Sequence, residues 1–158
     1  MISKIIKNRK VFIYKNNEIK GAGILFYKDN KLLLIKNLDR KILYEDFGGK
    51  VEMSDNYVYE TAAREAVEES NNYFKYDKLI SKLKNRKFIY IKHSKYAIYL
   101  VKLNKYINPS VVGNYEKTYK INRTIEWINI NELNKIKLLY RLRHKYLLKI
   151  IQKLYIKK

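Results

Sequence analysis

Hydrophobic and polar residues alternate with the spacing of β-strands in several parts of the chain. The apolar runs at residues 19–27 and 31–36 are separated by the sequence KDN, whose Asp and Asn suit a tight turn, so they predict a β-hairpin. Residues 87–92 and 95–103 are rich in aromatic and β-branched side chains and predict a second hairpin. Residues 124–130, with the sequence TIEWINI, predict a further strand.

A helix is predicted at residues 57–70, which contain neither Gly nor Pro. Its small and apolar residues recur at helical spacing, at Val58, Ala62, Ala66 and Val67. Asp55 or Asn56 lies where an N-cap residue is expected. Asn71 and Asn72 can adopt the left-handed conformation that ends a helix.

The last part of the chain carries an apolar stripe among Lys and Arg residues and predicts a basic helix at about 132–156. An interruption is expected near Leu138 to Arg141. The stripe consists of Leu133, Ile136, Leu139, Leu142, Tyr146, Ile150 and Leu154. Hairpins and helices in 158 residues, without an internal repeat or low-complexity linker, favour one α+β domain spanning residues 1–158.

The composition excludes several classes of site. The chain has no Cys, so it has no disulfide framework, thiolate metal site or thiol nucleophile. Its basic N-terminus lacks the apolar core of a secretory signal, and no apolar run approaches the ~20 residues of a membrane span. We therefore expect a soluble, intracellular (cytoplasmic) protein without a membrane partner.

The net charge of +20 has two interpretations. A basic surface attracts phosphate-bearing partners such as RNA by long-range attraction and counterion release. Alternatively, the abundance of Lys, Ile, Asn and Tyr is what an A/T-rich coding sequence produces without selection for binding. The charge alone therefore assigns no function.

The acidic residues, in contrast, are concentrated in one window. Eight of the fifteen lie within residues 45–69, where the net charge is −6, while the rest of the chain sums to +26. On a helix, Glu65, Glu68 and Glu69 stand at i, i+3 and i+4, so their like charges repel each other near the helix C-terminus, which also disfavours negative charge. A divalent cation held by carboxylates would offset this repulsion, and Arg64 can pair with Glu68 at i, i+4. The alternative is an ordinary solvated acidic face.

Two glycines precede this helix. Gly48 and Gly49 allow backbone conformations closed to other residues, so a carbonyl can turn into the site and a phosphate can approach the main chain closely. Together, the glycine pair and the acidic helix favour a site for a cation and a phosphate.

The sequences GGKVEMSD and REAVEES together resemble the Nudix box of the Nudix hydrolases. In this match Gly49 is the first glycine of the box and residues 64–69 are its Arg-Glu and Glu-Glu pairs. TIEWINI, followed by NELNKI, resembles the Glu-Trp strand and short helix that often come late in Nudix domains. The chain departs from the box where Asp55 replaces a glutamate with one extra residue before Arg64, and where Asn71 or Asn72 replaces the closing glycine.

The resemblance implies the Nudix fold, a mixed β-sheet sandwiched between helices, and hydrolysis of a pyrophosphate bond that depends on Mg²⁺ or Mn²⁺. It implies metal binding by Glu65, Glu68 and Glu69, with the Gly48 carbonyl as a further ligand. Arg64 would orient a glutamate. Glu65 or a late residue, best matched by Glu116, would act as general base, with a solvated loop glutamate as the alternative for Glu116. His93 and His144 are expected to be surface or packing residues.

The sequence does not identify the substrate. A nucleoside-diphosphate-linked substrate is implied by the family, and capped RNA, a (d)NTP, a dinucleoside polyphosphate and a diphosphoinositol are all candidates. Many Nudix domains are homodimers. The alternative of another class is a catalytically silent Nudix-like module that binds RNA or another polyanion, although the intact glutamates of REAVEE argue against it.

Overall fold

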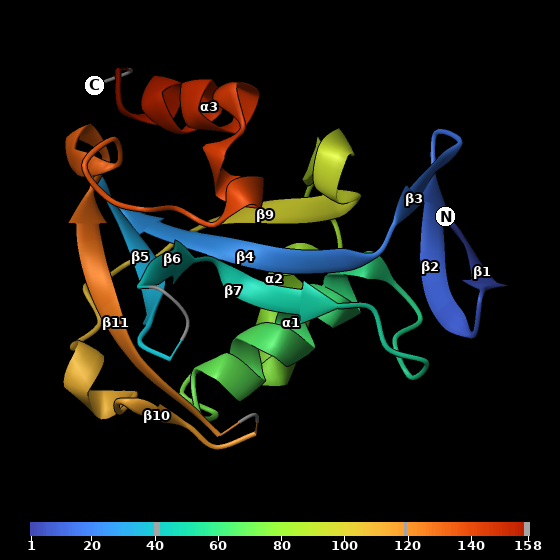
Figure 1. Cartoon of the computed structure of the whole chain (residues 1–158), viewed down its shortest axis with the longest axis horizontal. Helices are drawn as coiled ribbons and strands as arrows, with labels where there is room; N and C mark the ends of the chain where they lie inside the picture. Colours follow the sequence, from blue (N-terminus) through green and yellow to red (C-terminus); the bar gives the residue numbers. More distant parts are fainter. Residues whose placement is uncertain (40–41, 119, 157–158) are drawn as a thin grey trace. The chain divides into compact units, whose positions relative to one another are not determined.

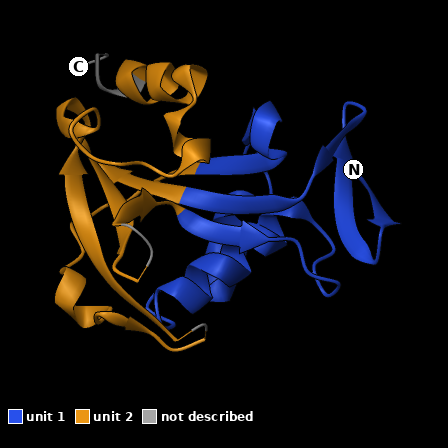
Figure 2. Cartoon of the chain, viewed as in Figure 1, with its two compact units in different colours: residues 1–24, 47–99 blue, residues 25–46, 100–158 orange. Residues whose placement is uncertain are grey.

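The computed structural model describes residues 1–39, 42–118 and 120–156 (Figure 1). These residues form three α-helices and a mixed β-sheet, together with a smaller sheet, which confirms the α+β class. The chain folds as two compact units, which we call unit 1 (residues 1–24 and 47–99) and unit 2 (residues 25–46 and 100–158) (Figure 2). Strands β4 (Gly21–Lys28) and β9 (Tyr96–Lys102) begin in unit 1 and end in unit 2.

Unit 1 starts with a three-stranded antiparallel sheet that the hydrophobic pattern did not predict. It consists of β1 (Ile2–Ile6), β2 (Arg9–Tyr14) and β3 (Asn17–Ile19). Both connections are two-residue turns in which the residues have positive φ, between 46° and 62°, as in the type I′ turns of hairpins. These turns contain Lys-Asn in place of a Gly-containing pair, and β1 is mostly exposed, so neither gives a strong sequence signal.

The rest of unit 1 places a helix against a strand. Strand β7 (Phe47–Lys50) pairs with the first half of β4, and β8 (Ile89–Ile91) pairs with β9 around a short 3₁₀ turn. The predicted second hairpin is therefore confirmed. Helix α1 (Val58–Glu69) packs against β7, and helix α2 (Tyr76–Leu83), which was not predicted, packs against α1.

Helix α1 matches its predicted range within one residue at each end, but its N-terminal cap differs. The N-cap residue is Tyr57, which makes no side-chain capping bond, and the Glu60 carboxylate instead accepts a hydrogen bond from the Asn56 N–H at 2.6 Å. The expectation that Asp55 or Asn56 caps the helix was wrong. The C-terminal expectation is confirmed, because Asn71 and Asn72 have φ values of 50° and 63°.

Unit 2 contains the other predicted hairpin and the late strand. The second half of β4 pairs with β5 (Lys31–Asn37), and Asp29 in the turn has a positive φ of 48°. Strand β6 (Leu43–Glu45) also pairs with β5. Strand β11 (Ile121–Asn129) pairs with β5 over seven residue pairs and, at its start, with the short β10 (Tyr115–Glu116). The predicted strand at 124–130 thus begins three residues earlier.

The C-terminal helix was predicted too long. Short 3₁₀ segments lie at Ile130–Glu132 and Tyr140–Arg143, and helix α3 covers only Lys145–Ile156. The expected interruption is present, and it shifts the buried face of α3 by one position, to Leu147 and Ile151, while Tyr146 is exposed. The side chain of Leu154 lies outside the described residues. Within the described part of the chain, no helix is long and apolar enough to span a membrane.

Candidate functional site

The site in unit 1 begins with a close approach of helix α1 to strand β7. Ala62 and Ala66 on α1 are fully buried and small, and a Cβ on Gly49 would overlap the Glu65 carboxylate. A Cβ on Gly48 would overlap the Tyr96 hydroxyl and the β4 backbone. Both glycines lie in a regular strand paired with β4, and neither has a positive φ. The predicted reason for the glycines, an unusual backbone conformation, was therefore wrong: they provide space.

Glu65 is buried beneath this contact, with only 4% of its surface exposed. Burial raises the pKa of its carboxyl group to about 7, although the charge and hydrogen bond of Arg64 lower it and the charges of Glu68 and Glu52 raise it further. The Glu65 carboxylate thus lies against the Gly49 backbone and is held away from bulk water. A positive charge placed there would stabilise the ionised form.

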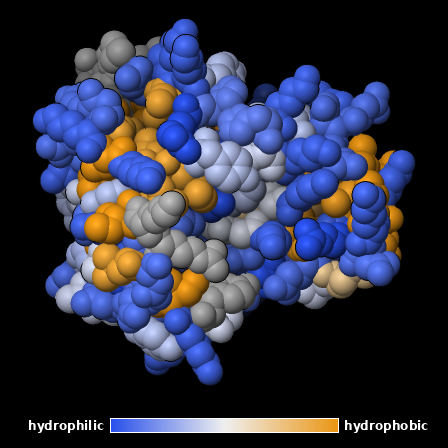
Figure 3. Space-filling model, in the orientation of Figure 1, coloured by the Kyte–Doolittle hydropathy of each residue, from blue (hydrophilic) through white to orange (hydrophobic). Residues whose placement is uncertain are grey.

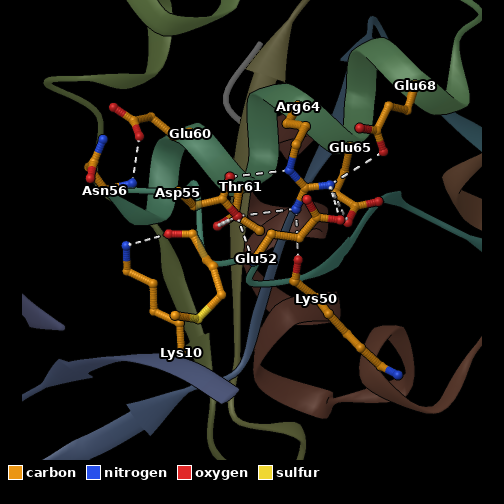
Figure 4. A network of polar contacts seen from close by, with 11 residues as sticks. Lys10, Lys50, Glu52, Asp55, Asn56, Glu60, Thr61, Arg64, Glu65 and Glu68 are labelled. Carbon is orange, nitrogen blue, oxygen red and sulfur yellow. Dashed lines mark hydrogen bonds and ion pairs between the residues drawn. The ribbon is translucent and has the colours of Figure 1, made fainter. Parts of the chain in front are cut away.

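Arg64 is the centre of the polar network shown in Figure 4. Its Nη1 lies 3.0 Å from Glu65 Oε1, 3.3 Å from Glu68 Oε2 and 3.5 Å from Glu52 Oε1, and its Nη2 donates to the Lys50 carbonyl at 2.8 Å. Burial would lower the pKa of the guanidinium, but its hydrogen bond with Asp55 and the charges of Glu65, Asp55 and Glu68 raise it. The predicted pairing of Arg64 with Glu68 is present as one contact among several.

Asp55 holds Arg64 in place. Its carboxylate accepts hydrogen bonds from Arg64 Nε and Nη2, each at 3.1 Å. This is the bidentate geometry of a strong Arg–carboxylate pair. It also accepts hydrogen bonds from the Glu52 N–H at 2.8 Å and the Thr61 hydroxyl at 2.9 Å, and only 3% of the residue is exposed. The extra residue before Arg64 is thus accommodated in the loop, and Asp55 connects that loop to α1.

The paired glutamates at the end of α1 have different partners. Glu69 Oε2 accepts a hydrogen bond from the Gly48 N–H at 2.7 Å, while Glu68 faces Arg64 and keeps about a quarter of its side chain exposed. The backbone of β7 therefore contacts two of the three predicted metal-binding glutamates, Glu65 through Gly49 and Glu69 through Gly48. Glu65, Glu68, Glu69, Arg64 and Gly48, all predicted as site residues, come together here.

The donor chemistry of this group fits a hard divalent cation. Carboxylate and backbone oxygens are the ligands that Mg²⁺ and Mn²⁺ prefer, and the buried Glu65 carboxylate lies against the Gly49 backbone. In the described residues, however, no three acidic or His side chains converge as a metal-binding cluster. The positive charge among the carboxylates is the Arg64 guanidinium.

The remaining predicted site residue, Glu116, belongs to unit 2. It lies in strand β10, is 3% exposed, and accepts a hydrogen bond from the Thr118 N–H at 2.8 Å. The alternative of a solvated loop glutamate was therefore wrong, and its role as a base stays a prediction. His93 is exposed in the β8–β9 turn and His144 is half-buried before α3, as the sequence led us to expect.

Sequence analysis missed Glu52, Thr61 and Lys10 as neighbours of the site. Glu52 contacts Arg64, Thr61 donates to Asp55, and the Lys10 Nζ donates to the Met53 carbonyl at 3.0 Å. Thr61 stands six residues after Asp55 on the inner face of α1, which is a weak signal. Lys10 gave no signal, because it lies in the unpredicted N-terminal sheet.

No protein-family model and no curated protein sequence matches the chain. Its fold does match many solved structures. An Ap4A hydrolase from C. elegans is 15% identical with a TM-score of 0.52, covering 87% of this chain and 96% of its own. A MutT structure from a study of Aliivibrio salmonicida and Vibrio cholerae is 11% identical with a TM-score of 0.52, covering 89% and 98%.

A third match is to part of a longer enzyme. The bifunctional NMN adenylyltransferase/ADP ribose pyrophosphatase from Francisella tularensis is 16% identical with a TM-score of 0.56, covering 89% of this chain and 42% of its own. Most of this chain therefore corresponds in fold to Nudix hydrolases. The protein has the Nudix fold, as the resemblance of its glycine loop and REAVEE helix implied.

Proposed function

We propose that the protein is a Nudix hydrolase that cleaves a pyrophosphate bond in a nucleoside-diphosphate-linked substrate with the help of Mg²⁺ or Mn²⁺. The observation that supports this most is the position of Glu65. Its buried carboxylate lies against the Gly49 backbone of β7, and Glu68 and Glu69 follow on the same helix. A structural role alone does not explain three glutamates at the C-terminal end of a helix, where negative charge is disfavoured.

In this proposal Glu65, Glu68 and Glu69 hold the metal, with the Gly48 carbonyl as a further ligand. The bound cation would neutralise the phosphate oxygens. Arg64 is a positioning residue, because it is anchored by Asp55 and contacts Glu65 and Glu68 instead of facing solvent. A Mn²⁺ ion accompanies AMP in one structure of the Francisella enzyme, whose chain this protein also covers only in part, at 43%.

Two residues are candidates for the general base. Glu65 has a pKa raised to about 7 by burial, near the value at which a general base works best at neutral pH. Glu116 is the late-fold alternative, and the matched pair Glu65→Gln and Glu116→Gln separates them. A fall in the catalytic rate constant in only one variant identifies the base, provided that this variant still binds both the metal and the substrate.

The structural matches support a range of phosphorylated substrates. Their printed names are Ap4A hydrolase, ADP ribose pyrophosphatase and MutT, which differ in what is joined to the diphosphate. A dinucleoside polyphosphate, a (d)NTP, a diphosphoinositol and capped RNA therefore all belong in the test. The fold alone selects none of them.

The test is hydrolysis of a panel of these substrates with Mg²⁺, Mn²⁺ or EDTA. The Glu68→Gln/Glu69→Gln variant should lose activity by at least a hundredfold, while Asp77→Asn, an exposed carboxylate on α2, should retain it. If the wild type cleaves nothing, or if the double variant is as active as the wild type, the enzyme proposal fails. In that case the catalytically silent polyanion-binding module becomes the better description.

A further inference from the structure

Unit 1 keeps its acidic and basic residues in different segments. Residues 1–17 contain five Lys or Arg and residues 78–99 contain seven, and neither segment contains an Asp or Glu. The carboxylates of unit 1 lie at Glu18 and within residues 52–77. An even scatter of surplus lysines, as expected from composition alone, would not produce this division.

The fold brings the two basic segments together. The ring of Tyr14, at the end of β2, lies 4.9 Å from the ring of Phe88 and 6.3 Å from that of Tyr90, measured between centroids. The Tyr90 hydroxyl donates to the Glu18 carbonyl at 2.9 Å. The end of β2 therefore packs against the segment that leads into β8.

We call this the basic aromatic surface and define it by Tyr14, Lys15, Lys84, Arg86, Lys87 and Phe88. Its four cationic residues are exposed and its two aromatic rings are half-buried. The Lys15 Nζ lies 5.4 Å from the centroid of the Tyr14 ring. The neighbouring carboxylate, Glu18, pairs with Lys95 at 2.6 Å and Lys20 at 3.3 Å, so its charge is offset locally. In Figure 3, hydrophilic side chains surround a small hydrophobic group at the N-terminal sheet, on the right of the view.

We propose that the basic aromatic surface binds single-stranded RNA. Exposed Lys and Arg side chains attract a phosphodiester backbone, and partly exposed aromatic rings stack on bases that are not paired in a duplex. A protein partner with an acidic surface would need no aromatic rings among the cations. Duplex RNA would contact the cations alone, because its bases are already stacked.

The N-terminal sheet that carries Tyr14 and Lys15 also contacts the loop that carries Asp55, within unit 1. Lys10 of the N-terminal sheet reaches the Met53 carbonyl, two residues before Asp55, as Figure 4 shows. An RNA on the basic aromatic surface would thus lie on the sheet that supports this loop. The choice of RNA over DNA rests on the proposed function, because an RNA 5′ end can carry the pyrophosphate linkage that a Nudix site would cleave.

The test measures binding of a fluorescent single-stranded RNA of about 20 nucleotides by anisotropy over a range of salt concentrations. It uses the Glu68→Gln/Glu69→Gln variant in EDTA, so the result does not depend on hydrolysis. Lys15→Gln/Lys84→Gln/Lys87→Gln should reduce the slope of log affinity against log salt by about 2. Phe88→Leu should weaken binding by about 5-fold to 100-fold, as expected for loss of one stacked base.

The matched control removes the same three charges from helix α3, as Lys145→Gln/Lys149→Gln/Lys153→Gln. All six lysines are exposed, so neither triple variant should disturb folding. If the α3 control loses as much affinity as the surface variant, binding follows total charge and the proposal is overturned. Equal affinity for duplex RNA of the same sequence overturns the choice of a single strand, because a duplex has no free bases to stack on the aromatic rings.

Discussion

At Arg64, one guanidinium group lies within 3.5 Å of four carboxylates and one backbone carbonyl. The most buried of the four is Asp55, which also binds the loop through the Glu52 N–H. The sequence match had left Asp55 in doubt, because one extra residue separates it from Arg64. The structure shows that Asp55 reaches Arg64 directly despite this extra residue.

The first prediction concerns this pair. Asp55→Asn keeps the size of the side chain but removes the most buried of the four carboxylates around Arg64, so we expect a loss of about 1–3 kcal/mol in the free energy of unfolding. Urea unfolding followed by circular dichroism measures it. Asp77→Asn removes an exposed carboxylate from the same unit and should change stability by less than about 0.5 kcal/mol. Equal midpoints for the two variants would contradict the anchoring role.

The second prediction concerns the pH dependence at Glu65, in metal-free buffer. The pKa is about 7 in the folded protein against 4.5 for the ordinary carboxyl group, so between these values the folded state binds more protons and stability falls as pH rises. Gln carries no charge at any of these pH values. The stability of Glu65→Gln relative to the wild type should therefore increase by about 2–3 kcal/mol between pH 5 and pH 8. A difference that does not change with pH would show that Glu65 is not desolvated.

At the scale of elements, the contact between α1 and β7 explains why the site is built where it is. Small residues on both sides allow the helix and the strand to approach, and Glu65 then lies against the strand backbone. Sequence analysis assigned the glycines to an unusual backbone conformation. A regular antiparallel strand that packs closely against a helix also requires glycine. The sequence alone does not distinguish this explanation from an unusual backbone conformation.

The third prediction tests this contact with a double-mutant cycle. Gly49→Ala should cost about 1–3 kcal/mol, because the added Cβ overlaps the Glu65 carboxylate. In a Glu65→Ala background the overlap disappears, so the cost of Gly49→Ala should fall below about 1 kcal/mol. If the two substitutions are additive, the glycine serves another purpose.

The fourth prediction concerns the face of helix α3. Leu147→Ala should destabilise unit 2 by about 2–5 kcal/mol, since Leu147 is fully buried. Tyr146→Ala, at the adjacent position that the sequence stripe had favoured, should change stability by less than about 0.5 kcal/mol, because 59% of Tyr146 is exposed. Thermal unfolding of the two variants measures both effects. A larger loss of stability in Tyr146→Ala than in Leu147→Ala would instead support the buried face that the sequence predicted.

At the scale of the whole molecule, the distribution of charge along the chain says more about a metal site than the net charge does. A chain of net charge +20 gathers eight of its acids in one window, and four of the six that belong to unit 1 lie around Arg64. The repulsion among them is offset only in part by that guanidinium, because Glu69 contacts the Gly48 N–H instead. A bound cation would complete the compensation.

The fifth prediction follows from this linkage between metal binding and stability. Mg²⁺ or Mn²⁺ at a hundred times its dissociation constant should raise the free energy of unfolding by about 2.7 kcal/mol. The increase should vanish in Glu68→Gln/Glu69→Gln and persist in Asp77→Asn. A wild type whose thermal midpoint does not move with either metal would contradict metal binding at these residues, whether or not the protein is an enzyme.

Local patterns predicted much of this protein. The REAVEE helix, the two hairpins, the strand at TIEWINI and the left-handed Asn71 and Asn72 all depend on residues close in sequence, where periodicity and turn chemistry decide the conformation. The Nudix fold was implied by the resemblance of the glycine loop and the REAVEE helix to the Nudix box, and the structural matches confirm the fold. The N-terminal sheet and α2 were missed because their elements are short, although the apolar residues of the eight-residue α2 do recur at helical spacing.

The features that only the tertiary structure decided are those that join distant segments. The bidentate pair of Asp55 and Arg64, the overlap that excludes a side chain at Gly49, and the meeting of Tyr14 with Phe88 each depend on distances that no local pattern encodes. The burial that raises the pKa of Glu65 has the same origin. The sequence determined which chemical groups are present and on which helix they stand, and packing determined which of them are desolvated and what they face.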